Sequence, residues 1–177
     1  KFETKIGGLE LITGVEAFDC EVEDVHQIVE GIVPEGIKML LGGTAKGNKS
    51  YMSMQLGMSI ANGEEHFLEF KIDNSKQYSV LYIDTEVGKN ELIRRYQRIL
   101  KNFKWNASSK FNMVSVYNKV DDYYKIIPQY IQQLKPDIVF VDCLYNTTEG
   151  NISKNSELAP TLDKIDTIIR RFKPITF

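Results

Sequence analysis

The stretch "LLGGTAKGNKSYMSMQL", residues 40–56, decides how the rest of the chain is interpreted. Phosphate-binding loops follow the pattern Gly, four residues, Gly, Lys, then Ser or Thr. Counting back from Lys49 places Gly43 at the first glycine of that pattern, but Asn48 stands where the second glycine belongs. The stretch is therefore either a nucleotide site with one tolerated substitution or a surface turn that resembles one.

The surroundings of this stretch have the order that a phosphate-binding loop requires. The apolar run "IKMLL" (37–41) predicts a strand before it, and the pattern of residues 50–62 predicts a helix after it, ending at Gly63. In this order backbone N–H groups can surround an anion at a helix N-terminus, and a cation can reach the outer phosphates. Lys49 would supply that cation, and the Ser50 hydroxyl a magnesium ligand. The close approach of the backbone would be permitted by Gly43, Thr44, Ala45 and Gly47.

Asn48 is the position that departs from the pattern. The glycine that it replaces normally has a left-handed backbone, and Asn is among the non-glycine residues that adopt this conformation most readily. The strain is of order 1–2 kcal/mol for an ordinary residue and smaller for Asn. Several charge-assisted contacts to phosphate can outweigh it. We interpret residues 43–50 as a nucleotide site, with an ordinary Gly/Asn turn before a helix as the alternative.

The rest of the chain alternates apolar runs with helical patterns. Continuous apolar runs are typical of strands buried on both faces, as in parallel sheets. Pro128 is expected to kink one of the helices or delay its start. The pattern predicts an α/β domain with a mostly parallel sheet and helices on both faces. Further strands are predicted at 78–84, 111–117, 137–142 and 174–177, and further helices at 90–103, 122–134 and 156–172.

Acidic residues end two of the predicted strands. Asp142 closes "DIVFVD", and Asp84 and Glu86 close "VLYIDTE". Ligands of such sheets bind beyond the carboxyl ends of the strands, and a nucleotide hydrolase needs one carboxylate near magnesium and one to activate water. We assign Asp142 to the hydrated metal and Glu86 to the general base. The alternative is that acids end strands because loops are solvated.

Composition limits the class of protein. The 177 residues suit one domain, and the net charge of -2 gives no electrostatic case for nucleic-acid binding by the chain as a whole. No apolar run reaches the ~20 residues of a membrane span, and the N-terminus lacks a secretion signal. Cys20 and Cys143 show no pairing pattern, which favours a reducing, cytoplasmic location. His26 and His66 have no neighbouring ligands at metal spacing, so we expect no zinc site.

The ends of the chain suggest a piece of a longer protein. Residue 1 is Lys rather than Met, and the chain stops at "KPITF", where an apolar run begins. We therefore expect the domain to be truncated at its C-terminal end. We divide the chain into an acidic lead (1–30) and a core (31–177). The resemblance described next implies that this core is an ATPase.

Three stretches carry a resemblance to RecA-fold P-loop ATPases of the RepA type, which include plasmid and phage replicative helicases. They are "VEGIVPEGIKMLLGGTAKGNKS" (29–50), "VLYIDTE…LIRRY" (80–96) and "PDIVFVDCLYNTTEGN…NSEL" (136–158). The resemblance implies hydrolysis of ATP with Mg²⁺ by a ring of identical subunits, commonly six. It also implies that Lys46 is a loop residue of the nucleotide site, and that the glycine before Lys49 is replaceable.

The same resemblance implies roles for three residues outside the loop. Glu86 corresponds to the water-activating glutamate, Asp142 to the metal-associated aspartate, and Arg95 to an arginine near the nucleotide. The family's polar sensor would fall just after Phe177, and its arginine or lysine finger comes from a neighbouring subunit.

Nucleic-acid contacts and the biological role are less determined by the sequence. The segment 144–157 corresponds to a region that often touches single-stranded DNA in RecA-like proteins, although an ordinary loop fits equally well. The basic residues Arg94, Arg95, Arg98 and Lys101 are interpreted as a solvated helix face. We expect a helicase or DNA-translocating ring. The alternatives are a recombination or regulatory ATPase without unwinding activity, and a non-catalytic nucleotide-binding assembly module.

Overall fold

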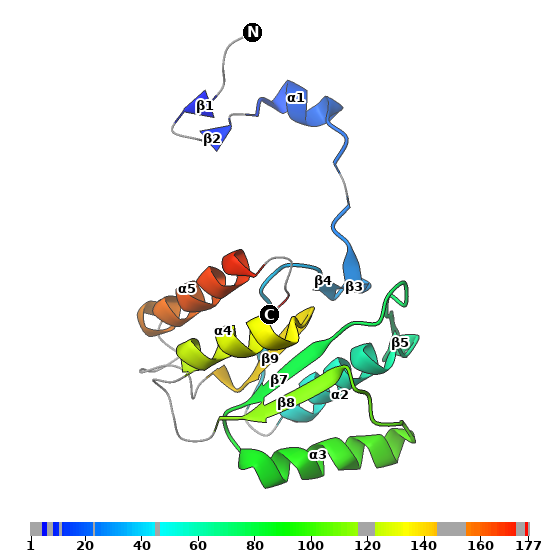
Figure 1. The fold of residues 1–177 in the computed structure, drawn as a ribbon. Helices are drawn as coiled ribbons and strands as arrows, with labels where there is room; N and C mark the ends of the chain where they lie inside the picture. Colours follow the sequence, from blue (N-terminus) through cyan, green and yellow to red (C-terminus); the bar gives the residue numbers. More distant parts are fainter. Residues whose placement is uncertain are drawn as a thin grey trace.

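The computed structural model describes residues 5–6, 9–10, 12–22, 24–44, 47–116, 123–144, 155–172 and 176. Its centre is a parallel sheet in the order β8-β7-β9. Asp84 at the end of β7 lies opposite Ser115 on one side and Asp142 on the other, so the carboxyl ends of the three strands meet at one edge (Figure 1). Three of the five predicted strands are confirmed as β7 (Val80–Asp84), β8 (Phe111–Ser115) and β9 (Ile138–Asp142).

Helices cover both faces of this sheet, which confirms the predicted α/β class. Because side chains alternate along a strand, Val80 and Tyr82 of β7 face one way and Leu81 and Ile83 the other. The first pair packs in a core with residues of α2 and α3, and the second in a core with residues of α4 and α5. The helices are α2 (Lys49–Asn62), α3 (Gly88–Phe103), α4 (Tyr123–Leu134) and α5 (Asn155–Arg171).

Two helix boundaries test the sequence reasoning. Gly63 ends α2 as predicted, with a φ of 71° and a backbone N–H that donates to the carbonyl of Ile60. The delayed start expected at Pro128 is not observed, because α4 begins at Tyr123 and continues through the proline. The missing N–H removes one backbone hydrogen bond, and burial of Tyr123, Ile127 and Ile131 on one stripe stabilises the helix despite it.

The predicted strand at 37–41 is wrong. Residues 37–44 form no strand, and Leu40 and Leu41 are 60% and 50% exposed. A strand needs a neighbour to pair its backbone, and a mainly apolar cavity of about 340 Å³ separates this segment from β9. We name it the β9 groove; its lining includes Val33, Leu41, Met52, Leu56, Phe70 and Phe140. On the same side of β9, Thr176 forms a parallel bridge with Ile138, while the rest of the run 174–177 lies outside the described residues.

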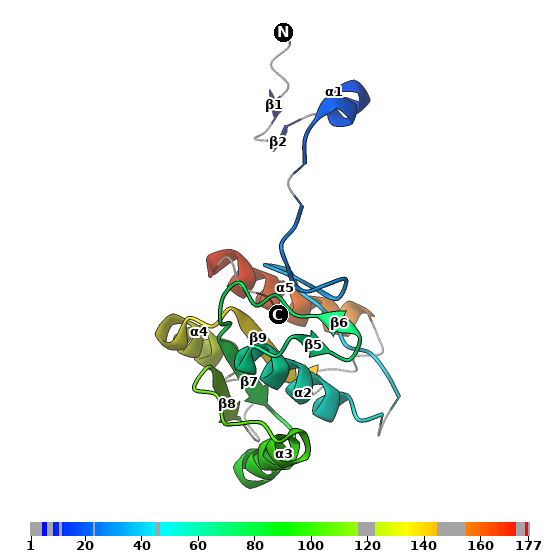
Figure 2. The ribbon, with the colours of Figure 1, turned by 90° about the vertical axis from the view of Figure 1, so that its right-hand side faces the viewer.

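Residues 5–71 contain short elements that the sequence patterns did not predict. Ile28 and Val29 of β3 are fully buried in the core, whereas no residue of α1 is buried, and Figures 1 and 2 show α1 apart from the body. The domain boundary at residue 30 stays a prediction. The elements are β1 (Lys5–Ile6), β2 (Leu9–Glu10), α1 (Gly14–Asp19), β3 (Gln27–Val29), β4 (Val33–Pro34), β5 (His66–Phe67) and β6 (Phe70–Lys71).

A search for membrane-spanning helices among the described residues found none with the required length and apolarity.

Candidate nucleotide-binding site

The loop before α2 has the backbone that its sequence suggested. Asn48 is left-handed, with φ 55° and ψ 21°, and it immediately precedes the first residue of α2. Gly47 closes a tight turn, since its N–H donates to the Thr44 carbonyl at 3.2 Å and a Cβ at this position would lie 3.1 Å from the same oxygen. Ala45 and Lys46 lie outside the described residues.

Lys49 points back over this loop. Its Nζ donates to the carbonyl oxygens of Gly43 at 3.0 Å and Thr44 at 2.7 Å. Asn48 makes no side-chain capping hydrogen bond to α2. The first N–H groups of the helix are therefore open to an anion, next to the positive charge of Lys49. This arrangement suits a phosphate group.

Ser50 and Asp142 come together although they are far apart in sequence. The Ser50 hydroxyl donates to Asp142 Oδ1 at 3.0 Å, which joins the start of α2 to the end of β9. The sequence placed a magnesium ligand at each of these positions, and the fold brings the two side chains into contact.

Tyr82, in the middle of β7, holds the other oxygen of the same carboxylate. Its hydroxyl donates to Asp142 Oδ2 at 2.7 Å, and the Ser53 hydroxyl lies 3.1 Å from it. Tyr82 is fully buried, and burial together with the negative charge of Asp142 raises the pKa of its hydroxyl, which therefore stays protonated and can donate.

Sequence reasoning missed Tyr82 as a site residue. A buried tyrosine needs a partner for its hydroxyl, so a single tyrosine inside the apolar run "VLYID" was the available signal.

The turn between β7 and α3 is built around Asp84. This residue is fully buried, and its carboxylate accepts hydrogen bonds from the backbone N–H groups of Val87 and Gly88, at 3.1–3.3 Å. Burial raises the pKa of Asp84, more than these hydrogen bonds lower it. Asp84 thus shapes the turn that carries Glu86.

Thr85 connects this turn to the end of β9. Its hydroxyl donates to the Cys143 carbonyl at 3.0 Å, and its backbone N–H donates to the Asp142 carbonyl at 2.8 Å. Glu86 follows with an exposed side chain, and within the described residues no hydrogen bond links it to Lys49 or Asp142. The fold places Glu86 at the same edge of the sheet as Asp142, and its role as the base stays a prediction.

Arg95 lies close to the start of α2. Its guanidinium is 5.6 Å from the centroid of the Tyr51 ring, and its Nε is 3.9 Å from Glu91 Oε1. Tyr51 directly follows Ser50, so the side chain of Arg95 packs beside the first turn of α2. A contact to nucleotide stays a prediction.

The oxygen donors at this edge fit Mg²⁺. Ser50 supplies a hydroxyl and Asp142 a carboxylate, and magnesium typically takes one or two such protein ligands together with water and substrate phosphates. Within the part of the chain that the structure describes, no group of three or more His, Cys, Asp or Glu side chains could hold a metal. A metal at Ser50 and Asp142 would therefore complete its shell with water and phosphate oxygens.

A comparison with family models agrees with this geometry. A model described as an AAA domain matches residues 9–177. The chain belongs to the AAA domain family. This family consists of P-loop ATPases, so the match supports a P-loop ATPase and, with it, nucleotide binding, while the assignment of residues 43–50 stays a prediction. No curated protein matched the chain.

Proposed function

We propose that this AAA domain is the motor core of a cytoplasmic ring that hydrolyses Mg-ATP and translocates on single-stranded DNA, as replicative helicases do. The observation that carries the catalytic part is the hydrogen bond from Ser50 to Asp142 beside Lys49, at the carboxyl edge of a parallel sheet. The resemblance of residues 29–158 to RepA-type ATPases supports the ring and the DNA.

Each residue of the site has a role in this proposal. Lys49 leaves the carbonyls of Gly43 and Thr44 and binds the outer phosphates together with the loop N–H groups. Ser50 and Asp142 would hold Mg²⁺, and the bound ion would neutralise phosphate charge. Glu86 orients the attacking water. A cation from a neighbouring subunit completes the site.

One observation favours a second candidate. Because Glu86 is exposed and forms no hydrogen bond to the loop within the described residues, the domain could bind nucleotide only to control assembly. Replacing Glu86 by Gln separates the two functions. A motor should lose ATP turnover in this variant, whereas an assembly module shows no turnover with either residue.

The decisive experiment measures phosphate release from Mg-ATP, with and without single-stranded DNA. The proposal expects turnover that DNA stimulates and that Lys49→Ala abolishes, because this variant removes the cation over the phosphates. Lys71→Ala, at an exposed lysine of β6, is the matched control and should leave turnover unchanged. Nucleotide binding without turnover would instead support the assembly module. DNA-independent turnover would support a regulatory ATPase.

A further inference from the structure

Residues 12–25, which we name the acidic arm, expose an unusual amount of apolar surface. Phe18 is 88% exposed and Val22 82%, and α1, which lies in the arm, has no buried residue. The helix is nevertheless well formed at its start, because Thr13 and Glu16 make a reciprocal capping box. Two of the exposed apolar side chains lie on α1 itself and three lie in the segments that flank it, and several exposed apolar side chains within 14 residues are typical of interaction surfaces. They are Ile12, Val15, Phe18, Val22 and Val25.

The charge of the arm indicates the kind of surface that it fits. The arm carries five acidic residues and no lysine, arginine or histidine. A partner surface should therefore combine positive charge with exposed apolar groups. The acidic residues are Glu16, Asp19, Glu21, Glu23 and Asp24.

The outer side of α3 has this combination. Phe103 is 46% exposed and stacks on Trp105 with 4.6 Å between ring centroids, which provides an apolar patch at the end of the helix. Glu91 is the one acid of α3, and it already lies 3.5 Å from Arg94 and 3.9 Å from Arg95. We name the exposed basic residues on this side of α3 and at its C-terminal end the α3 basic face: Arg94, Arg98, Lys101 and Lys104.

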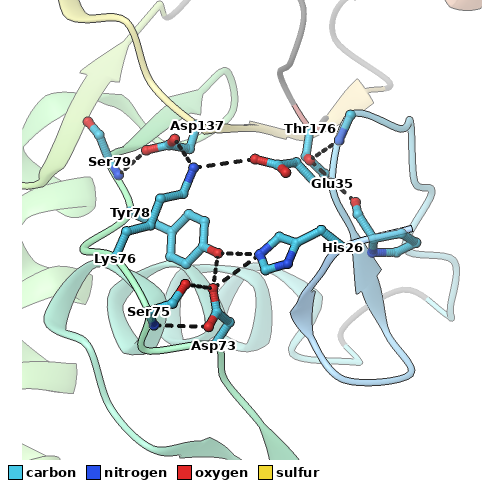
Figure 3. Close-up of polar contacts among 11 residues, drawn as sticks. His26, Glu35, Asp73, Ser75, Lys76, Tyr78, Ser79, Asp137 and Thr176 are labelled. Atoms are coloured by element: carbon cyan, nitrogen blue, oxygen red, sulfur yellow. Dashed lines mark hydrogen bonds and ion pairs between the residues drawn. The ribbon is translucent and has the colours of Figure 1, made fainter. Parts of the chain in front are cut away.

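The arm is anchored on the side of the body away from its own α3. Figure 3 shows the anchor, in which His26 Nε2 lies 2.7 Å from the Tyr78 hydroxyl and 3.1 Å from Asp73 Oδ2. Beside it, Lys76 bridges Glu35 at 3.3 Å and Asp137 at 3.0 Å. From His26 the arm runs outward, and Figures 1 and 2 place α1 and α3 at opposite ends of the molecule.

We infer that the acidic arm of one copy docks on the α3 basic face of a second copy of this chain. The inference rests on the ring assembly of the proposed function, and it names the surfaces that join neighbouring subunits. Since the two surfaces differ, the contact is heterologous, and repeated contacts of this kind produce rings or open filaments. Association through charged surfaces should weaken as salt increases.

A charge exchange in the full chain tests the inference. Asp19→Lys with Glu21→Lys reverses charge on the arm, and Arg94→Glu with Lys101→Glu reverses it on α3. Each pair alone should weaken self-association at least tenfold in sedimentation experiments at low salt, and the four substitutions together should restore most of it. Glu65→Lys with Glu69→Lys, at exposed acids outside the arm, is the matched control and should leave association unchanged.

Other results would overturn the inference in distinguishable ways. If the chain assembles and the arm variants assemble equally well, then other surfaces join the subunits and the proposed ring survives without this contact. If the unmodified chain stays monomeric at all concentrations tested, both the docking and the ring fail, while its ATPase activity can still be measured. If the α3 pair alone loses binding of single-stranded DNA and association is unaffected, the α3 basic face is a nucleic-acid surface.

Discussion

Asn48 shows how a single backbone conformation determines which residues a loop accepts. Its φ of 55° lies in the left-handed region that glycine adopts without strain. We expect Asn48→Gly to retain nucleotide binding with little change in the free energy of unfolding. Asn48→Ala should lower that free energy by about 1 kcal/mol, because an ordinary side chain is strained there.

Urea unfolding of both variants, with and without ATP, measures this difference. Equal stability of the Ala and Gly variants would show that the left-handed conformation at residue 48 contributes nothing.

Tyr82 should act as a positioning residue for Asp142. Tyr82→Phe keeps the ring that packs between Phe111 and Phe140 but removes the hydroxyl that donates to Asp142 Oδ2. A hydrogen bond to a charged group contributes about 1.5–3 kcal/mol. We expect phosphate release at limiting Mg²⁺ to fall by about tenfold, the equivalent of about 1.4 kcal/mol, and to recover partly at high Mg²⁺.

The control for this prediction is Tyr96→Phe. Tyr96 lies on α3, and its ring stacks on Phe111 with 5.5 Å between the ring centroids. A purely structural role for Tyr82 would lower the free energy of unfolding without changing the Mg²⁺ dependence of turnover.

At the residue scale the sequence predicted the conformation of the loop better than the side chains that hold Asp142 in place. The left-handed Asn48 and the pairing of Ser50 with Asp142 follow from local spacing and from the rule that ligands lie at the carboxyl ends of parallel strands. The hydrogen bond from Tyr82 depends on the register between β7 and β9, which pairs Tyr82 with Phe140. The register between two strands that are far apart in the chain cannot be predicted from a local sequence pattern.

At the scale of elements, the anchor around His26 gives a pH-dependent connection between the N-terminal segment and the body. Burial by itself raises the pKa of Asp73, but hydrogen bonds from Tyr78 and Ser75 and the neighbouring His26 outweigh it and lower the pKa from 3.8 to about 2. The carboxylate form is therefore favoured by folding. Its stabilising contribution is complete above pH 3.8 and is lost as the pH falls toward 2.

We expect Asp73→Asn to be less stable than the parent near pH 6, with a smaller difference at pH 2. Denaturant unfolding at several pH values measures this, with Asp163→Asn, at an exposed acid of α5, as the control. A difference between Asp73→Asn and the parent that stays constant from pH 6 to pH 2 would contradict the assigned role of the carboxylate.

The elements that the sequence predicted correctly are those with a long apolar run or a long helical pattern. Helix α4 buries Tyr123, Ile127 and Ile131 at helical spacing, and β7 is buried at every position, so both patterns can be recognised in the sequence. The run 37–41 was assigned to a strand because it is apolar, but strand formation depends on a backbone neighbour that apolarity does not specify. The short hairpins β3–β4 and β5–β6 were missed because two or three residues carry no period.

At the scale of the whole molecule, the β9 groove should bind apolar probes in the native state. Its lining is mainly apolar, and Leu41 beside it is 50% exposed, so a substitution there should not unfold the protein. We expect the fluorescence of anilinonaphthalene sulfonate to rise on mixing with the folded chain and to fall severalfold with Leu41→Glu. Phe103→Glu, an equally exposed position outside the groove, is the control; the same loss in both variants would contradict binding in the groove.

The hydrogen bond between Ser50 and Asp142 also has a consequence for how the chain folds. It joins residues 92 positions apart, and the bond between Gly36 and Thr176 joins residues 140 apart. Contacts between distant residues require large loops to close before they stabilise anything, and chains rich in them fold slowly. In the proposed function Mg-ATP binding uses such a contact, whereas helix formation depends on neighbouring residues. If Ser50 and Asp142 act as proposed, competence to bind Mg-ATP cannot arise from any short section of this chain, because it requires the strand pairing that brings β9 beside β7.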